Sequence, residues 1–188
     1  MNDEIPGDGA PKQKRKNSRV GVDPLVMPPI LDACCGGRMF WWDKKNEHTF
    51  YADKREVDKG AFNNNWNPGW CIKPDKLHDF RNMPYPDKTF KMVVFDPPHL
   101  TSGSEKSVIN IKYGLLNKET WKADIVAGFS ECWRVLDDWG VLIFKWNEAN
   151  IKAKELLRAF PVEPLFGDFT GKTGNTIWVT FMKVPEAA

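Results

Sequence analysis

Apolar residues in this chain fall into short runs that are separated by turn-forming and charged residues. Seven of these runs have the length and composition of strands; they are Ile30–Cys34, His48–Asp53, Lys76–Phe80, Lys91–Phe95, Gly140–Trp146, Glu163–Phe166 and Asn175–Met182. The longer stretch Lys118–Leu136 repeats apolar residues mostly three or four apart, which predicts a helix with one buried face. Two further helices are expected, one starting within Arg38–Lys45 and one at Ile151–Phe160.

The order of these elements predicts an α/β fold. Strands alternate with helices, and the last two strands surround a turn at Gly171–Gly174, which predicts a terminal hairpin. We therefore expect a Rossmann-like, mostly parallel sheet of seven strands, with helices on both faces and a C-terminal antiparallel hairpin. The chain of 188 residues suits one domain, which we expect over residues 25–188.

The first 24 residues differ from the rest of the chain in charge and composition. Five positive charges lie between Lys12 and Arg19, within a polar segment that contains proline and glycine. We expect residues 1–24 to be a disordered basic leader. A solvated tail and an arm that binds phosphate groups both fit this pattern.

The overall composition is typical of a globular protein, with 41% hydrophobic and 28% charged residues. No apolar stretch has the length of a membrane span, and the N-terminus lacks the apolar core of a signal peptide, so we expect a cytoplasmic protein with no membrane association. The four cysteines show no CxxC spacing, and only three histidines accompany them. We expect neither a metal site nor a disulfide framework.

The tetrapeptide Asp96-Pro97-Pro98-His99 follows the apolar run that ends at Phe95. Two consecutive prolines stiffen the backbone and supply no N–H, so the carbonyls of this loop are available as acceptors. The Asp96 carboxylate and the Pro97 carbonyl are therefore suited to hold one amino group. A plain strand end, with Asp96 capping a loop, is the alternative. Residues 100–114 hold Gly and Ser without a clear period, which predicts a loop over this site.

Acidic residues near the ends of the earlier strands are placed to hold a nucleoside. Asp32 precedes the turn Gly36–Gly37, and Asp53 ends the next strand about twenty residues later. Ligands of open α/β sheets lie across the carboxyl ends of the strands, where an acid at this spacing suits a ribose. The turn lacks the GxGxxG pattern, so we expect a ligand with a nucleoside and few phosphates.

An aromatic, amide-rich segment, Phe62–Trp70, holds Trp66 and Trp70 without a regular period. Aromatic rings and amide groups in a loop can stack on a nucleic-acid base and hydrogen-bond to it. A packed surface loop is the alternative for either tryptophan.

Taken in chain order, these motifs resemble the class I S-adenosylmethionine-dependent methyltransferases. The residues that carry the resemblance are Leu31-Asp32-Ala33-Cys34-Cys35-Gly36-Gly37, Asp53, Asp79-Phe80 and Asp96-Pro97-Pro98-His99. The last motif is similar to the (D/N/S)-P-P-(Y/F/W) signature of the amino-group methyltransferases of DNA and RNA, with His99 in place of the aromatic residue. The resemblance spans Ile30 to Met182 and implies a Rossmann-like fold with S-adenosyl-L-methionine as cofactor.

The resemblance also implies roles for individual residues. Asp32 and the turn Ala33–Gly37 would lie by the methionine moiety of the cofactor, Asp53 would bind the ribose hydroxyls, and Asp79 with Phe80 would meet the adenine. In the motif Asp96–His99, Asp96 and the Pro97 carbonyl would accept hydrogen bonds from the target amino group and align its lone pair for in-line transfer. We further assign Trp66, Trp70 and Lys145 to substrate binding.

The resulting functional expectation is methyl transfer to an exocyclic amino group of a nucleic-acid base, with adenine N6 ahead of cytosine N4. DNA and RNA both stay open as substrates. The chain has little room for a separate recognition region, so we also consider a homodimer or a protein partner that supplies one. The alternatives are methylation of a protein amide or a small molecule, or an inactive subunit that binds nucleic acid or a partner.

Overall fold

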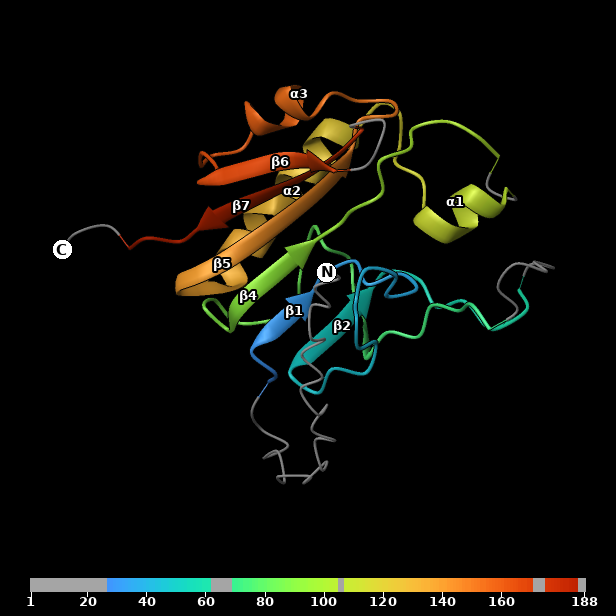
Figure 1. Ribbon diagram of the computed structural model, residues 1–188, viewed down its shortest axis with the longest axis horizontal. Helices are drawn as coiled ribbons and strands as arrows, with labels where there is room; N and C mark the ends of the chain where they lie inside the picture. The colour runs from blue at the N-terminus through green and yellow to red at the C-terminus, as the bar shows by residue number, and fades with distance from the viewer. Residues whose placement is uncertain (1–26, 62–68, 105–106, 171–174, 186–188) are drawn as a thin grey trace, which may run out of the picture.

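A computed structural model describes residues 27–61, 69–104, 107–170 and 175–185, which form one seven-stranded sheet with helices packed around it (Figure 1). The strands are β1 (Ile30–Asp32), β2 (Thr49–Asp53), β3 (Lys76–Leu77), β4 (Phe90–Phe95), β5 (Leu136–Asn147), β6 (Phe166–Thr170) and β7 (Thr176–Met182). The helices are α1 (Val108–Tyr113), α2 (Trp121–Val135) and α3 (Ala153–Leu157).

The strand order across the sheet is β3-β2-β1-β4-β5-β7-β6. Strand β1 runs parallel to β2 and β4, and β4 parallel to β5, whereas β7 is antiparallel to β5 and β6. This arrangement confirms the expected mostly parallel sheet with a C-terminal hairpin. The chain moves outward from β1 to β3 and returns to β4 on the other side of β1, and ligands of open α/β sheets bind at such a reversal of strand order.

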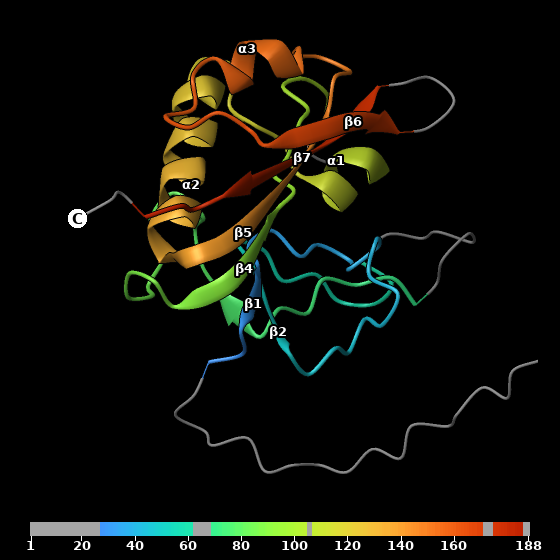
Figure 2. The same ribbon diagram turned by 60° about the vertical axis from the view of Figure 1, so that its left-hand side comes forward.

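Helix α2 lies against one face of the sheet (Figure 2). Ile125 and Phe129 are fully buried there, and the Phe129 ring stacks on Phe160 with centroids 4.0 Å apart. Burying each of these large side chains stabilises the fold by about 1.5–3 kcal/mol. Gly128 allows this close packing, because a Cβ at its position would lie 2.7 Å from the Phe95 ring.

The prediction of a helix that starts within 38–45 is wrong. Turns form this segment, which packs on the face of the sheet opposite to α2. Arg38 has a left-handed backbone conformation, with φ of 53°. The neighbouring side chains reach different strands, since the Phe40 ring lies 5.5 Å from Trp178 of β7 and the Trp41 ring lies 5.4 Å from Tyr51 of β2. These tertiary contacts override the local helix pattern.

Several element boundaries also differ from the sequence-based expectation. Strand β3 ends at Leu77, and the buried ring of the following residue, His78, donates from Nε2 to the Ala33 carbonyl at 3.0 Å. Helix α1 occupies a segment expected to be a loop, and the Ser107 hydroxyl caps it by accepting a hydrogen bond from the Asn110 N–H at 3.2 Å. Strand β6 lies later in the chain than the strand expected at 163–166, and α3 is shorter than the helix expected at 151–160.

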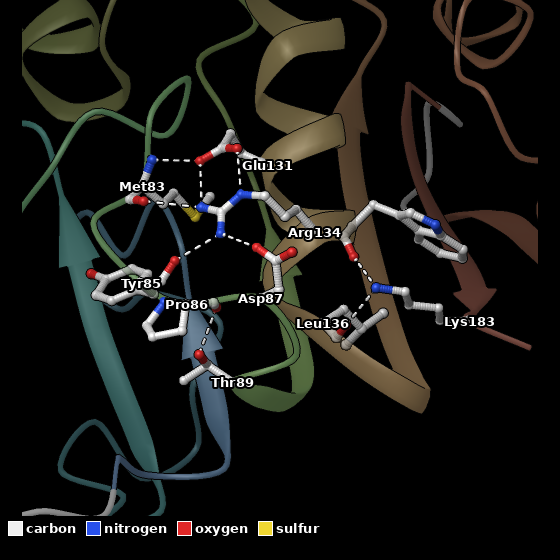
Figure 3. Close-up of polar contacts among 10 residues, drawn as sticks. Met83, Tyr85, Pro86, Asp87, Thr89, Glu131, Arg134, Leu136 and Lys183 are labelled. Carbon is white, nitrogen blue, oxygen red and sulfur yellow. Dashed lines mark hydrogen bonds and ion pairs between the residues drawn. The ribbon is translucent and has the colours of Figure 1, made fainter. Parts of the chain in front are cut away.

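The segment that leads into β4 is fixed to the end of α2 by Arg134 (Figure 3). The guanidinium donates to the Tyr85 carbonyl at 2.8 Å and the Met83 carbonyl at 3.0 Å, and it pairs with Asp87 at 2.8 Å. Glu131, one turn earlier, accepts the Met83 N–H at 2.7 Å. Bonds between a guanidinium and several fixed acceptors hold the start of β4, and hence the motif at its end, in one register.

Some of the expected features lie outside the described residues. These are the basic leader at 1–24, the tryptophan Trp66 and the hairpin turn at 171–174. Within the ranges that are described, no helix is both long and apolar enough to span a membrane.

Candidate active site

A pocket of about 340 Å³ opens at the carboxyl ends of β1, β2 and β4. It is lined by Cys34, Cys35, Gly36, Gly37, Met39, Phe40, Asp53, Lys54, Arg55, Phe80, Asp96, Pro97, Pro98, His99, Lys112, Tyr113, Gly114, Leu115 and Lys145. The glycine turn, Asp53, Phe80, the whole motif Asp96–His99 and Lys145 therefore share one cavity. Its volume lies within the range of roughly 300–1,000 Å³ that is typical of small-molecule sites.

The glycine turn and Asp53 are joined directly. The Gly36 N–H donates to Asp53 Oδ2 at 2.9 Å. Gly36 has φ of 47°, which favours glycine, and a Cβ there would meet no atom within 4 Å. Without a side chain, this turn leaves its backbone open to the pocket.

Arg55 connects Asp53 to the helix on the other side of the pocket. Its backbone N–H and its Nε donate to Asp53 Oδ1 at 2.9 and 3.3 Å, and its Nη1 donates to the Ile111 carbonyl of α1 at 2.9 Å. Asp53 is 4% exposed, so these bonds compensate for the burial of its charge. Sequence reasoning missed Arg55, because its partner in α1 lies far along the chain.

Asp32 and Ala33 lie behind the turn and do not line the pocket. Asp32 is fully buried and accepts hydrogen bonds from Trp41 Nε1 at 2.7 Å and from the Cys34 N–H at 3.3 Å. Burial raises the pKa of the Asp32 carboxyl to about 7, with a smaller contribution from the charge of Asp96. These residues support the turn from beneath, together with His78, whose position no sequence pattern indicated.

Trp70 also lies outside the pocket lining and is 7% exposed. It packs under Gly37, where a Cβ would come within 2.5 Å of the indole Nε1. The assignment of Trp70 to substrate binding therefore finds no support in its position, and glycine at 37 is explained by this close approach.

Asp79 and Phe80 point in different directions. Phe80 lines the pocket, whereas the Asp79 carboxylate pairs with Arg81 at 2.6 Å and with Lys54 at 3.2 Å. The Arg81 guanidinium holds the pKa of Asp79 well below its usual range. Of the two residues expected at the adenine, only Phe80 reaches the cavity.

The acid of the motif forms an ion pair inside the pocket. Lys145 Nζ donates to Asp96 Oδ2 at 2.7 Å, and the two side chains are 24% and 20% exposed. Burial raises the pKa of the Asp96 carboxyl, and the Lys145 charge opposes this shift. The Lys145 ammonium also lies 5.6 Å from the Phe40 ring centroid and 5.7 Å from that of Trp178, close enough for cation–π attraction.

His99, the last residue of the motif, lies beside helix α1. Its ring centroid is 5.8 Å from Tyr113 and 6.3 Å from Trp146. Burial, with the charge of Lys145, lowers the pKa of His99 to about 4, so the imidazole is neutral at physiological pH. A neutral imidazole can stack on an aromatic ring or hydrogen-bond to it.

Helix α1 completes the wall of the pocket with Tyr113 and Lys112. The chain leaves α1 at Gly114, whose φ of 80° favours glycine and where a Cβ would lie 2.9 Å from Pro98 Cγ. The capping pair of Ser107 and Asn110 was the local signal that could have revealed this helix from sequence. Among the described residues, no group of His, Cys, Asp and Glu has an arrangement that could hold a metal ion.

Comparison with known proteins shows the fold of the chain. No protein-family model matches it, and no curated protein matches it in sequence. A solved SAM-dependent methyltransferase from Methanosarcina mazei is 13% identical, with 84% of this chain and 92% of that chain covered and a TM-score of 0.52. The described residues therefore have the α/β fold of that protein.

Two other solved structures cover a similar share of the chain. A variant of the 16S rRNA (adenine(1408)-N(1))-methyltransferase from Catenulisporales acidiphilia is 9% identical, covers 87% of this chain and 88% of its own, and has a TM-score of 0.46. The [4+2]-cyclase SpnF is 13% identical, covers 82% of this chain and 74% of its own, and has a TM-score of 0.49.

Proposed function

We propose that this protein is an S-adenosylmethionine-dependent methyltransferase that acts on an exocyclic amino group of a nucleic-acid base, adenine N6 ahead of cytosine N4. The observation that carries the proposal is that Asp96–His99 lines the same pocket as the Gly36–Gly37 turn and Asp53. One end of this cavity offers a turn and an acid suited to a nucleoside. The other end offers acceptors suited to an amino group.

The residues at the first end fit the cofactor. Among the residues that the structure describes, Asp53 Oδ2 accepts a hydrogen bond from the Gly36 N–H alone, so it keeps an acceptor position for a ribose hydroxyl. Phe80 offers an apolar surface to the adenine, and the side-chain-free Gly36 lets the methionine part approach the backbone. Bound here, S-adenosylmethionine would supply an electrophilic methyl group, which leaves sulfur as the target nitrogen's lone pair forms the new bond.

The motif residues would hold the target nitrogen. Asp96 Oδ2 is occupied by Lys145, whereas Asp96 Oδ1 has no hydrogen-bond partner within the described ranges. Oδ1 and the Pro97 carbonyl are then acceptors for the two N–H groups, which leaves the nitrogen lone pair exposed for attack. The proton that nitrogen loses after transfer passes to water. The stiff Pro97-Pro98 backbone keeps these acceptors fixed.

A nucleic-acid substrate is supported by a second, basic hollow beside α2 and α3. It is lined by Lys122, Lys152, Lys154, Glu155, Arg158 and Ala159, so four cations accompany one acid. The Thr101 N–H, in the loop after the motif, donates at 3.3 Å to Oδ1 of Asn150, two residues before Lys152 of this hollow. A hollow lined mostly by cations suits the phosphates that flank a target base. Adenine is placed first because its larger ring offers more surface to His99 and Tyr113.

The test is a radiolabelled methyl-transfer assay against DNA, RNA and protein pools, followed by nucleoside mass spectrometry. We expect methylated adenine from a nucleic-acid pool, and its loss in Asp96→Ala while calorimetry still detects cofactor binding. Asp58→Ala is the matched control, because Asp58 also pairs with a lysine at 2.7 Å but lies outside the pocket. Label in protein alone would favour the amide methyltransferase, and no cofactor binding would favour the inactive subunit.

A further inference from the structure

We propose that Lys145 recognises the ring nitrogen next to the target amino group, so that Asp96 and Lys145 together select an amino group with an adjacent hydrogen-bond acceptor. This inference rests on the proposed function and names the substrate edge that the site reads. It assigns to Lys145 a specificity role that the motif Asp96–His99 alone does not supply.

The position of Lys145 follows from the alternation of strand β5. Its neighbours Phe144 and Trp146 are fully buried in the core, where the ring centroids of Phe144 and Phe160 lie 5.2 Å apart. Successive strand residues point to opposite faces, so Lys145 projects to the other side, opposite Trp178 of β7 in the strand register. Its ammonium group reaches the pocket there and meets Asp96.

The ammonium keeps donors available for a ligand. It carries three N–H groups, and only one of them has a hydrogen-bond acceptor among the described residues, Asp96 Oδ2 at 2.7 Å. The rings of Phe40 and Trp178 flank it but accept no conventional hydrogen bond. Asp96 Oδ1 and the remaining Lys145 donors therefore form an acceptor and a donor side by side at the pocket.

This donor–acceptor pair matches the edge of an amino-bearing base. The adenine N6 amino group lies between two ring acceptors, N1 and N7, and the cytosine N4 amino group lies beside N3. The amino hydrogens would go to Asp96 and the Pro97 carbonyl, while Lys145 would donate to the neighbouring ring nitrogen. An alkyl amine has no such acceptor and would leave the Lys145 donor unpaired in a partly buried site.

The charge of the pair adds a second selection. Lys145 balances the carboxylate, so the site has little net attraction for a protonated amine, whose nitrogen has no lone pair to attack a methyl group. A base amino group is neutral at physiological pH and is held by hydrogen bonds instead. The ion pair therefore favours neutral amino groups over lysine-like ammonium groups.

The experiment uses oligonucleotides that carry one target adenine, replaced in turn by 1-deazaadenine and 7-deazaadenine. For the unmodified protein, loss of a hydrogen bond from a charged donor predicts a roughly ten- to one-hundred-fold loss in kcat/KM for one of the two analogues and little change for the other. In Lys145→Met the two analogues and adenine should differ by less than about threefold. In the same variant, the binding affinities for the three oligonucleotides, measured by fluorescence anisotropy, should also become alike.

Lys112→Met is the matched control, since Lys112 also lines the pocket but lies over Tyr113, at 5.2 Å from the ring centroid. This variant should keep the difference between analogues. Equal kcat/KM for adenine and both analogues in the unmodified protein would overturn the inference without requiring any variant to fold. Discrimination that persists in Lys145→Met would overturn it as well. No methylation of the parent oligonucleotide would contradict the proposed function itself, and the two failures are thereby distinguished.

Discussion

Asp32 and Asp96 stand at the carboxyl ends of neighbouring parallel strands, β1 and β4, yet their surroundings differ sharply. Asp32 is fully buried, bonds to the Trp41 indole and stays outside the pocket lining. Asp96 is one-fifth exposed, pairs with Lys145 and lines the pocket. The same sequence signal, an acid at the end of an apolar strand, thus marks a support for the turn in one strand and a ligand-facing group in the next.

The partner of each acid accounts for this difference. The Trp41 indole N–H is a neutral donor that belongs to the protein itself. The Asp32 carboxyl is therefore hydrogen-bonded inside the fold and removed from water. Lys145 is a cation with further N–H donors. It holds the Asp96 carboxylate in place while leaving it accessible to a ligand in the pocket. An acid at a strand end is therefore better judged by the group that it meets than by the strand that it follows.

The largest expected effect is that substitution of Asp96 lowers activity, whereas substitution of Asp32 lowers stability. Asp96→Ala should lower methyl transfer by about 10²–10³-fold, the cost of losing one fixed polar group at the reacting centre. Its free energy of unfolding should change by less than about 1 kcal/mol, because the ion pair is partly exposed. Asp32→Ala should instead lower the free energy of unfolding, since it leaves the partly buried Trp41 N–H without its acceptor. Urea unfolding and single-turnover assays on both variants test this, and a large stability loss in Asp96→Ala would break the comparison.

A second prediction uses the pH dependence of stability. The Asp32 carboxyl holds its proton to about pH 7 in the folded protein but releases it near 3.8 when unfolded. Its stabilising contribution is therefore complete below about pH 4 and is lost as the pH rises through 7. Between about pH 5 and pH 8, the unmodified protein should lose on the order of 2–3 kcal/mol more unfolding free energy than Asp32→Asn. Parallel pH curves for the two proteins would contradict the buried, protonated Asp32.

Removal of the Trp41 indole N–H should have a smaller, also pH-dependent, effect on the free energy of unfolding. Trp41→Phe removes the donor to Asp32 Oδ2 and should cost about 1–3 kcal/mol of unfolding free energy, more at pH 8 than at pH 5 because the charged carboxylate needs the bond most. The neighbouring Trp42 is fully exposed, so Trp42→Phe is the matched control and should be neutral. Equal effects of the two substitutions in thermal unfolding would show that the indole bond does not stabilise Asp32.

The smallest effect concerns the acid limb of the pH–rate profile. His99, with a pKa of about 4, should not titrate between about pH 5 and pH 8, so an acid limb there belongs to a carboxyl whose pKa is raised by burial, Asp32 or Asp96. In His99→Phe the limb should keep its position. A limb that disappears in His99→Phe would assign the titration to the imidazole.

The sequence predicted the part of the fold that depends on local pattern. The apolar run before Asp96 became β4, and the periodic stretch 118–136 became α2. The helix expected at 38–45 failed because Phe40 and Trp41 find partners on distant strands, which no local window contains. Helix α1 was missed because it has only six residues and its stability comes from Ser107 and Arg55 rather than from an apolar stripe.

The candidate site was predicted at the level of its motifs. The turn Cys34–Gly37, Asp53, Phe80 and the motif Asp96–His99 meet in one pocket, because each follows a strand whose carboxyl end lies at the same edge of the sheet. Side-chain direction was beyond sequence reasoning: Asp79 turns to Arg81 and Trp70 packs under Gly37. Both outcomes depend on long-range packing.

The Arg55 bridge makes the two ends of the pocket thermodynamically linked. Arg55 binds the Asp53 carboxylate at one end and the Ile111 carbonyl of α1 at the other. In the proposed function, a ribose hydroxyl on Asp53 Oδ2 draws on the same carboxylate that holds Arg55 through Oδ1, so ribose binding changes the free energy of holding α1 beside His99. Linkage is reciprocal, so a substrate that fixes α1 must alter the affinity for the nucleoside by the same factor. Cofactor affinity measured without substrate would then differ from cofactor affinity in the ternary complex.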